Sequence, residues 1–143
     1  MEETPRELNW VKVRAECTIR SMFTKLRHEI EGDVSGRDER LSESQKSNGV
    51  IFSVDDTDDG TFAVYRKGPG LAGSVSLGVI GDSIKAIDAI GAEIMVATIG
   101  MNDNGRCMLR VPKADSSGRI TGYCEIETWR FRKKTMESLF FWY

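Results

Sequence analysis

Residues 74–100, SVSLGVIGDSIKAIDAIGAEIMVATIG, are the most apolar stretch of the chain and decide the fold class. Within this stretch, every second residue of 75–79 and of 94–98 is apolar or β-branched. Gly81-Asp82 and Gly91 interrupt the stretch with residues that favour turns. Alternation of this kind, divided by turn residues, predicts consecutive strands of an antiparallel sheet.

The same pattern extends the sheet on both sides of this stretch, so that it covers residues 49–112. Asp55–Gly60 and Asn102–Gly105 are rich in residues that tolerate tight turns and predict hairpin loops. About six strands are expected, at 50–54, 61–67, 74–80, 83–89, 93–100 and 106–111. A sheet with one apolar face needs a covering layer, and the two ends of the chain are expected to supply it.

The N-terminal end predicts one long helix over residues 5–32. Thr4-Pro5-Arg6-Glu7 has the pattern of a capping box with proline at the first helical position. One helix face would collect eight apolar residues, namely Leu8, Val11, Ala15, Ile19, Met22, Phe23, Leu26 and Ile30. Residues 10–17 also alternate, so a strand there, followed by a shorter helix, is the competing interpretation.

The C-terminal end predicts a second helix over residues 123–141. Its apolar stripe would consist of Ile126, Trp129, Met136 and Phe140. Between the first helix and the sheet, residues 33–48 are polar and rich in serine, which predicts a solvated loop.

These elements predict a single α+β domain spanning residues 1–143, in which a curved antiparallel sheet of about six strands is packed by an N-terminal and a C-terminal helix. If residues 10–17 are a strand, the order becomes β-α-β6-α, which is similar to the helix-grip arrangement. That resemblance implies a terminal helix closing the sheet over a ligand cavity.

The composition is ordinary for a globular protein, with a formal net charge of −2. No run approaches the ~18 apolar residues needed to span a bilayer, and the acidic start does not look like a secretory signal, so no membrane association is expected. Cys17, Cys107 and Cys124 are odd in number and widely spaced, which predicts reduced thiols and a cytoplasmic protein.

The sequence contains few groups that could act together in catalysis. Gly81-Asp82-Ser83-Ile84 resembles the nucleophile motif of the GDSL hydrolases, but that chemistry needs a histidine, and the only one is His28, far upstream. On one helix His28 and Cys17 would lie about 16 Å apart, too far for a thiol–imidazole pair. An enzymatic activity is therefore not expected.

Two further motifs resemble ligand sites without meeting their requirements. Gly68–Val75 is rich in glycine like a phosphate loop, but a strand rather than a helix is expected after it. Asp55–Gly60 is acidic, yet the twelfth position counted from Asp55 is Arg66 instead of the glutamate of a calcium loop. No cofactor and no metal are expected.

Two kinds of surface remain as candidate sites. The first is apolar and predicts a protein interface at the two ends of the chain, made of Trp10, Val13, Cys17, Phe141, Trp142 and Tyr143. The second is a basic cluster that could contact an anion or a nucleic acid, made of Arg130, Arg132, Lys133 and Lys134.

Three functions follow from these surfaces. The favoured hypothesis is a non-enzymatic interaction module that self-associates, as a homodimer for example, or joins a complex. The second is a carrier of a small apolar ligand, with a cavity between the sheet and the C-terminal helix. The third is a protein that associates with nucleic acid through the basic C-terminal helix.

Overall fold

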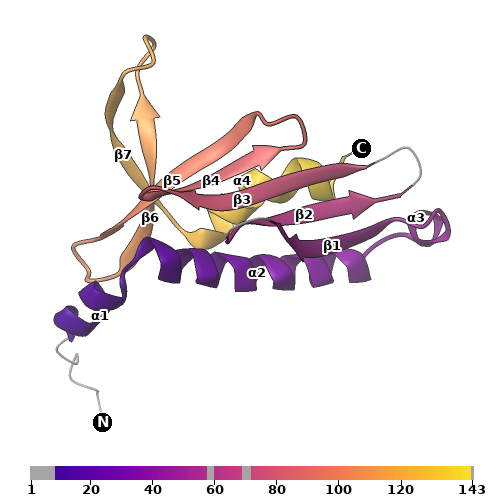
Figure 1. Ribbon diagram of the computed structural model, residues 1–143, viewed down its shortest axis with the longest axis horizontal. Helices are drawn as coiled ribbons and strands as arrows, with labels where there is room; N and C mark the ends of the chain where they lie inside the picture. The colour runs from indigo at the N-terminus through magenta and orange to yellow at the C-terminus, as the bar shows by residue number, and fades with distance from the viewer. Residues whose placement is uncertain (1–8, 58–59, 69–71, 143) are drawn as a thin grey trace.

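A computed structural model describes residues 9–57, 60–68 and 72–142 of the chain (Figure 1). Three helices come first, seven strands follow, and a fourth helix ends the described chain. Their bounds are α1 Trp10–Glu16, α2 Ile19–Glu39, α3 Glu43–Ser47, β1 Ile51–Asp56, β2 Phe62–Lys67, β3 Gly73–Ile80, β4 Ser83–Asp88, β5 Glu93–Met101, β6 Cys107–Ala114, β7 Ile120–Ile126 and α4 Thr128–Phe140.

The strands form one antiparallel sheet in which each strand pairs with its neighbours in sequence, from β1 to β7. The turn between β3 and β4 contains Gly81 at a φ of 63°, and the turn between β5 and β6 contains Gly105 at 74°. Both angles lie in the left-handed region that glycine adopts without strain. The predicted α+β class and the antiparallel sheet are confirmed, with seven strands instead of about six.

Both long helices cover the same face of the sheet. Phe62 and Arg66 of β2 are four residues apart and therefore point to the same side of the strand. The Phe62 ring packs 5.3 Å from that of Phe23 on α2, measured between centroids. Arg66 donates a hydrogen bond of 2.8 Å to the backbone carbonyl of Leu139 on α4. The core lies between the sheet and these helices, and its fully buried side chains include Leu26, Ile30, Phe62, Leu77, Ile84, Leu109 and Phe131.

The predicted long N-terminal helix is broken into α1 and α2. Thr18 has an extended backbone, with φ −120° and ψ 154°, and its hydroxyl accepts a hydrogen bond from the Ser21 amide, so it begins a new helix. Residues 10–16 are helical, which makes the strand interpretation and the β-α-β6-α order wrong. The expected capping box at 4–7 and Leu8 lie outside the described residues. In α1, Val11 is exposed and no residue is buried, so this half of the expected stripe does not join the core.

The predicted loop over 33–48 is also wrong, because α2 continues to Glu39. Val34 and Arg37 extend the buried face of Ile30 by one and two turns, which keeps the helix on the sheet. After α2, Ser42 and Gln45 form a capping box and start α3. This serine and glutamine, three residues apart, were the signal in the sequence for a further helix.

The C-terminal helix begins at Thr128 rather than at 123, because β7 occupies Ile120–Ile126. Of the expected stripe, Met136 and Phe140 belong to the buried face of α4, which also includes Phe131, Thr135 and Leu139, whereas Ile126 is the last residue of β7. Trp129 lies outside that face and is 50% exposed, so its predicted place in the core is wrong.

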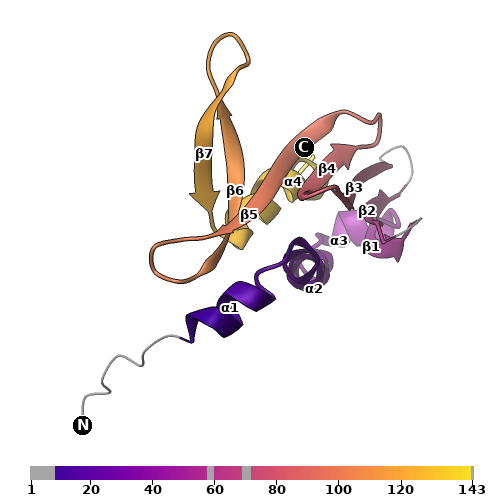
Figure 2. The same ribbon diagram turned by 60° about the vertical axis from the view of Figure 1, so that its left-hand side comes forward.

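The β6–β7 hairpin projects away from the rest of the molecule in two views (Figures 1 and 2). No residue of β7 is buried, and the register between β6 and β7 shifts at Lys113/Ala114. A bulge of this kind twists an edge strand and weakens its pairing with other chains. At the opposite edge, the amide of Phe52 on β1 donates to the Asp38 carboxylate at 3.2 Å.

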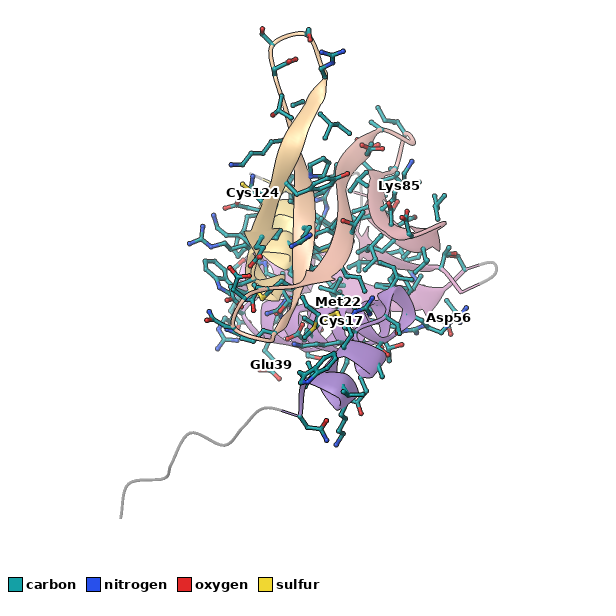
Figure 3. The ribbon with its side chains drawn as sticks, turned by 90° about the vertical axis from the view of Figure 1, so that its left-hand side faces the viewer. Cys17, Met22, Glu39, Asp56, Lys85 and Cys124 are labelled. Carbon is teal, nitrogen blue, oxygen red and sulfur yellow. A yellow bond between two sulfur atoms is a disulfide. The ribbon has the colours of Figure 1, made fainter. Side chains whose placement is uncertain are left out.

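Cys17 and Cys107 form a disulfide, with a sequence separation of 90 residues, so the prediction of three reduced thiols is wrong. Figure 3 shows Cys17 beside Met22 and Cys124 apart from it; Cys124 is a free thiol. The bond ties the junction of α1 and α2 to the first residue of β6. The expectation of a cytoplasmic location depended on three reduced thiols, and the disulfide removes that support.

Among the residues described, no helix is long and apolar enough to cross a membrane.

Candidate binding groove between α2 and α4

A groove of about 960 Å³ runs between α2 and α4, larger than two other pockets of about 320 and 370 Å³. We call it the α2–α4 groove. Its walls are mostly apolar and come from α2, α3, the segment just before α3, and α4 with the residue after it: Gly32, Asp33, Gly36, Arg37, Arg40, Ser42, Gln45, Trp129, Arg132, Lys133, Met136, Glu137, Phe140 and Phe141.

Two arginines join the helices, one near each end of the groove. Arg132 of α4 places its Nη1 atom 2.9 Å from both carboxylate oxygens of Asp33 on α2. Arg37 of α2 donates from Nε to the backbone carbonyl of Phe140 at 2.8 Å. Because the contacts advance along both helices together, α2 and α4 run in roughly the same direction.

Asp33 has an unusual electrostatic environment for an ion-paired carboxylate. Burial raises the pKa of Asp33 above its ordinary value, and the nearby carboxylate of Glu29 adds to this effect. Attraction to Arg132 and the hydrogen bond from it lower the pKa, but they do not compensate for the loss of water. The ion pair is therefore held in a partly dehydrated wall of the groove.

The α2 wall of the groove contains two glycines at helical positions. Gly32 and Gly36 are four residues apart and lie on the same side of α2. A Cβ atom at Gly32 would meet nothing within 4 Å, and one at Gly36 would meet only Arg40 Nη1 at 3.7 Å. Neither is among the glycines with positive φ. Each glycine costs about 1 kcal/mol relative to alanine in a helix, and packing within the chain does not require either one.

The last aromatic residues pack around two arginines and close one end of the groove. The Arg37 guanidinium carbon lies 4.6 Å from the Phe141 ring centroid, and that of Arg66 lies 4.6 Å from the Trp142 centroid. Burial lowers the pKa of Arg66. The Phe52 ring packs edge-on to that of Phe140 at 5.3 Å. These contacts hold the end of α4 against α2 and the sheet. They indicate a structural role for the C-terminal aromatic residues.

The groove is positively charged, although the chain as a whole has a formal net charge of −2. Two acidic side chains line it, Asp33 and Glu137. Four basic side chains line it, Arg37, Arg40, Arg132 and Lys133. The described lining residues therefore carry a formal net charge of +2.

The structure separates the residues of the predicted apolar interface. Trp10 is 65% exposed on α1, and Val13 is half-buried. Cys17 is buried in the disulfide and presents no free surface. Phe141 and Trp142 lie at the other end of α2, a helix about 31 Å long, and Tyr143 lies outside the described residues. The two halves of the predicted interface do not form one surface.

The basic cluster is also divided. Arg132 is paired with Asp33, and Lys133 lies 3.6 Å from the Glu137 carboxylate. Arg130 stacks over the exposed Trp129 ring at 5.1 Å. Lys134 lines a pocket of about 370 Å³ between α4 and the sheet. The four side chains therefore face different neighbours.

That smaller pocket occupies the place expected for a ligand cavity between the sheet and the C-terminal helix. Arg66, Asp88 and Lys134 are among its lining residues, so several of its walls are charged. Both the α2–α4 groove and this smaller pocket have mostly apolar surface with several charged side chains at their walls.

The remaining motifs do not come together as a reactive site. Gly81 and Asp82 form the β3–β4 turn, and His28 is exposed on α2. Gly73 already belongs to a strand, and residues 58–59 and 69–71 of the acidic and glycine-rich motifs lie outside the described part. Within the described residues, no group of three or more His, Cys, Asp or Glu side chains could hold a metal ion.

No family model, curated protein or solved structure is significantly similar to the chain. The sequence prediction missed the groove because residues 33–48 were expected to be a loop. The signal in the sequence was Gly32 and Gly36 with apolar Val34 between them, a spacing that fits a helix with one buried and one open face.

Proposed function

We propose that the protein is a non-enzymatic interaction module whose α2–α4 groove binds a helix of a partner protein. The groove is partly open to solvent and has a volume of about 960 Å³. Pockets for small ligands usually enclose most of the ligand's surface within about 300–1,000 Å³. The volume of the groove lies within that range, but the groove is open to solvent, and an open groove suits an elongated ligand better than a small enclosed molecule.

The observation that carries the proposal is the pair of glycines in the α2 wall. Gly32 and Gly36 lower the helix propensity of α2 without relieving a clash or adopting a backbone that requires glycine. Small residues on a helix allow another helix to approach closely, with the axes at the short end of the usual 8–10 Å range. The cost of the glycines is explained if that second helix comes from outside the chain.

Charge indicates that the partner helix is acidic. The groove lining is positive by +2, and complementary charge speeds association and selects partners. The exposed helix α1 of a second copy is a poor candidate, because Lys12 and Arg14 outnumber Glu16 in it. Self-association through this groove is therefore not the arrangement we propose, and neither cytoplasmic location nor nucleic-acid binding is needed for it.

A selection experiment tests the proposal even though the partner is unidentified. A displayed library of helical 16-residue peptides is selected against the whole protein, and backbone amide NMR shifts map each binder. We expect binders that perturb residues 32–40 and 129–141. Gly32→Leu, which fills open space in the groove, should abolish their binding.

Ser35→Leu is the matched control, because Ser35 is exposed on the same helix but does not line the groove. Binding to this variant should persist. Selection that yields no groove-directed binder, or binders unaffected by Gly32→Leu, would contradict the proposal. Light scattering of the free protein shows whether a second copy occupies the groove instead.

A further inference from the structure

We infer that the partner helix binds in one direction, with its acidic residues beside Arg40 and its apolar residues along Trp129 and Met136. This inference rests on the proposed function and adds a polarity to it. It follows from the way in which charge is distributed between the two ends of the groove.

At the Trp129 end, the charges are already balanced within the chain. Arg132 contacts the Asp33 carboxylate at 2.9 Å, and Lys133 lies 3.6 Å from that of Glu137. The Trp129 side chain, half-exposed, supplies apolar surface there. A partner residue at this end meets a neutral surface with an aromatic wall.

At the other end, Arg37 and Arg40 both line the groove, and neither forms an ion pair with a described carboxylate. Arg37 is buried and directs its guanidinium to the carbonyls of Phe140 and Arg40. Three aromatic rings also lie against this guanidinium, and the residue is only 8% exposed, so little of it is open to a partner.

Arg40 is different, because it is exposed at the C-cap of α2 and, among the described residues, its side chain donates one hydrogen bond, to the carbonyl of Gly36 at 3.0 Å. A guanidinium has five N–H donors in a planar fork that matches a carboxylate. Of the two arginines, Arg40 is therefore the exposed one whose donors can reach a partner's aspartate or glutamate. Its position next to Gly36 places that contact at the glycine-bearing wall, where the partner helix comes closest.

The same peptide selection, repeated on charge variants, tests the polarity. The variants are Arg40→Glu and, as a matched control, Arg20→Glu, which changes an exposed arginine of α2 that does not line the groove. Circular dichroism confirms that each variant folds. We expect Asp and Glu at one end of the peptides selected on the native protein, Lys and Arg at the same end on Arg40→Glu, and unchanged preferences on Arg20→Glu.

A second measurement uses one groove-binding peptide and its isomer with the acidic residues moved to the opposite end. The isomer should bind about tenfold more weakly to the native protein, corresponding to about 1.4 kcal/mol. Arg40→Glu should remove that difference. Groove binders without an acidic end, or with preferences that survive Arg40→Glu, would overturn the polarity and leave the proposed function standing; a selection without groove binders would overturn both.

Discussion

The two faces of α2 differ in how completely the chain covers them. Toward the sheet, Leu26 and Ile30 are fully buried and Val34 nearly so. Toward α4, Gly32 and Gly36 leave a groove that no described residue fills. Large buried side chains identify the packed face. The open face is identified only by glycines at positions where packing within the chain does not require glycine. This open face is the basis of the proposed binding of a partner helix.

The largest effect is expected on the packed face. Ile30→Ala removes most of a fully buried side chain and leaves a cavity beneath the sheet. The free energy of unfolding should fall by about 2–5 kcal/mol, the usual range for this substitution. Urea denaturation followed by circular dichroism measures the change. Ser35→Ala, on an exposed position of the same helix, should shift the value by less than about 0.5 kcal/mol. Equal effects at the two positions would mean that α2 does not pack as described.

The disulfide holds the beginning of the packed face, because Cys17 directly precedes the N-cap of α2. Cys17→Ser releases a link between residues that are 90 apart in sequence and should lower the stability by about 2–4 kcal/mol. Thermal unfolding with and without a reducing agent measures this. The native protein should lose stability on reduction, whereas Cys17→Ser should not respond. Cys124→Ser, which removes the free thiol, serves as the control; a reductant effect that persists in Cys17→Ser would exclude the Cys17–Cys107 bond as its source.

On the open face, substitution should stabilise the protein. Gly32→Ala and Gly36→Ala add a Cβ that meets open space or an ordinary contact, so each should raise the free energy of unfolding by about 1 kcal/mol. Binding of a groove-directed peptide should weaken in the same variants, because the partner helix can no longer approach as closely. Loss of stability would show that the fold requires the glycines. Unchanged peptide binding would show that the glycines are not needed for close approach of a partner helix.

The contrast also explains how much of this molecule could be predicted from the sequence. Strands such as β3 were predictable, because alternation along 75–79 reflects a sheet with one buried side. The buried half of α2 was predictable for the same reason. The break at Thr18 was not, since the apolar spacing continues across it and only the backbone of one residue changes. The disulfide could not be predicted, because it depends on which strand lies opposite Cys17.

The sequence did not predict the groove, for a different reason. Residues 33–48 contain many serines and charges, which predict a loop, and the buried positions Val34 and Arg37 are too few to reverse that. A buried arginine contributes to a packed face here because it binds carbonyls and rings of α4, contacts that exist only after folding. Candidate sites chosen for their exposed aromatic or basic side chains therefore missed the proposed site, which two glycines and the end of a helix form.

The smallest effect concerns Asp33, which lies between the two faces. Burial raises its pKa above the ordinary value of 3.8, so the folded state retains a proton that the unfolded state has lost. Stability from this group therefore falls as the pH rises from 3.8 through the folded pKa. Asp33→Asn removes this dependence: the stability of the native protein relative to the variant should decline from pH 3 to pH 7. The Arg132 pair forms only as Asp33 ionises, so its attraction opposes the effect of burial, and the sign of the slope shows which of the two is larger.

Asp115, in the turn between β6 and β7, supplies a control of opposite sign. Hydrogen bonds from Ser117 and the Arg119 amide lower its pKa, so the stability it contributes is present above pH 3.8 and is lost as the pH falls through the folded value. Relative to Asp115→Asn, the native protein should therefore gain stability as the pH rises through the acidic range. Slopes of the same sign for both variants would mean that the Arg132 ion pair outweighs burial at Asp33, and that this wall of the groove is well hydrated. A bound partner helix would then have to displace that water before contacting α2.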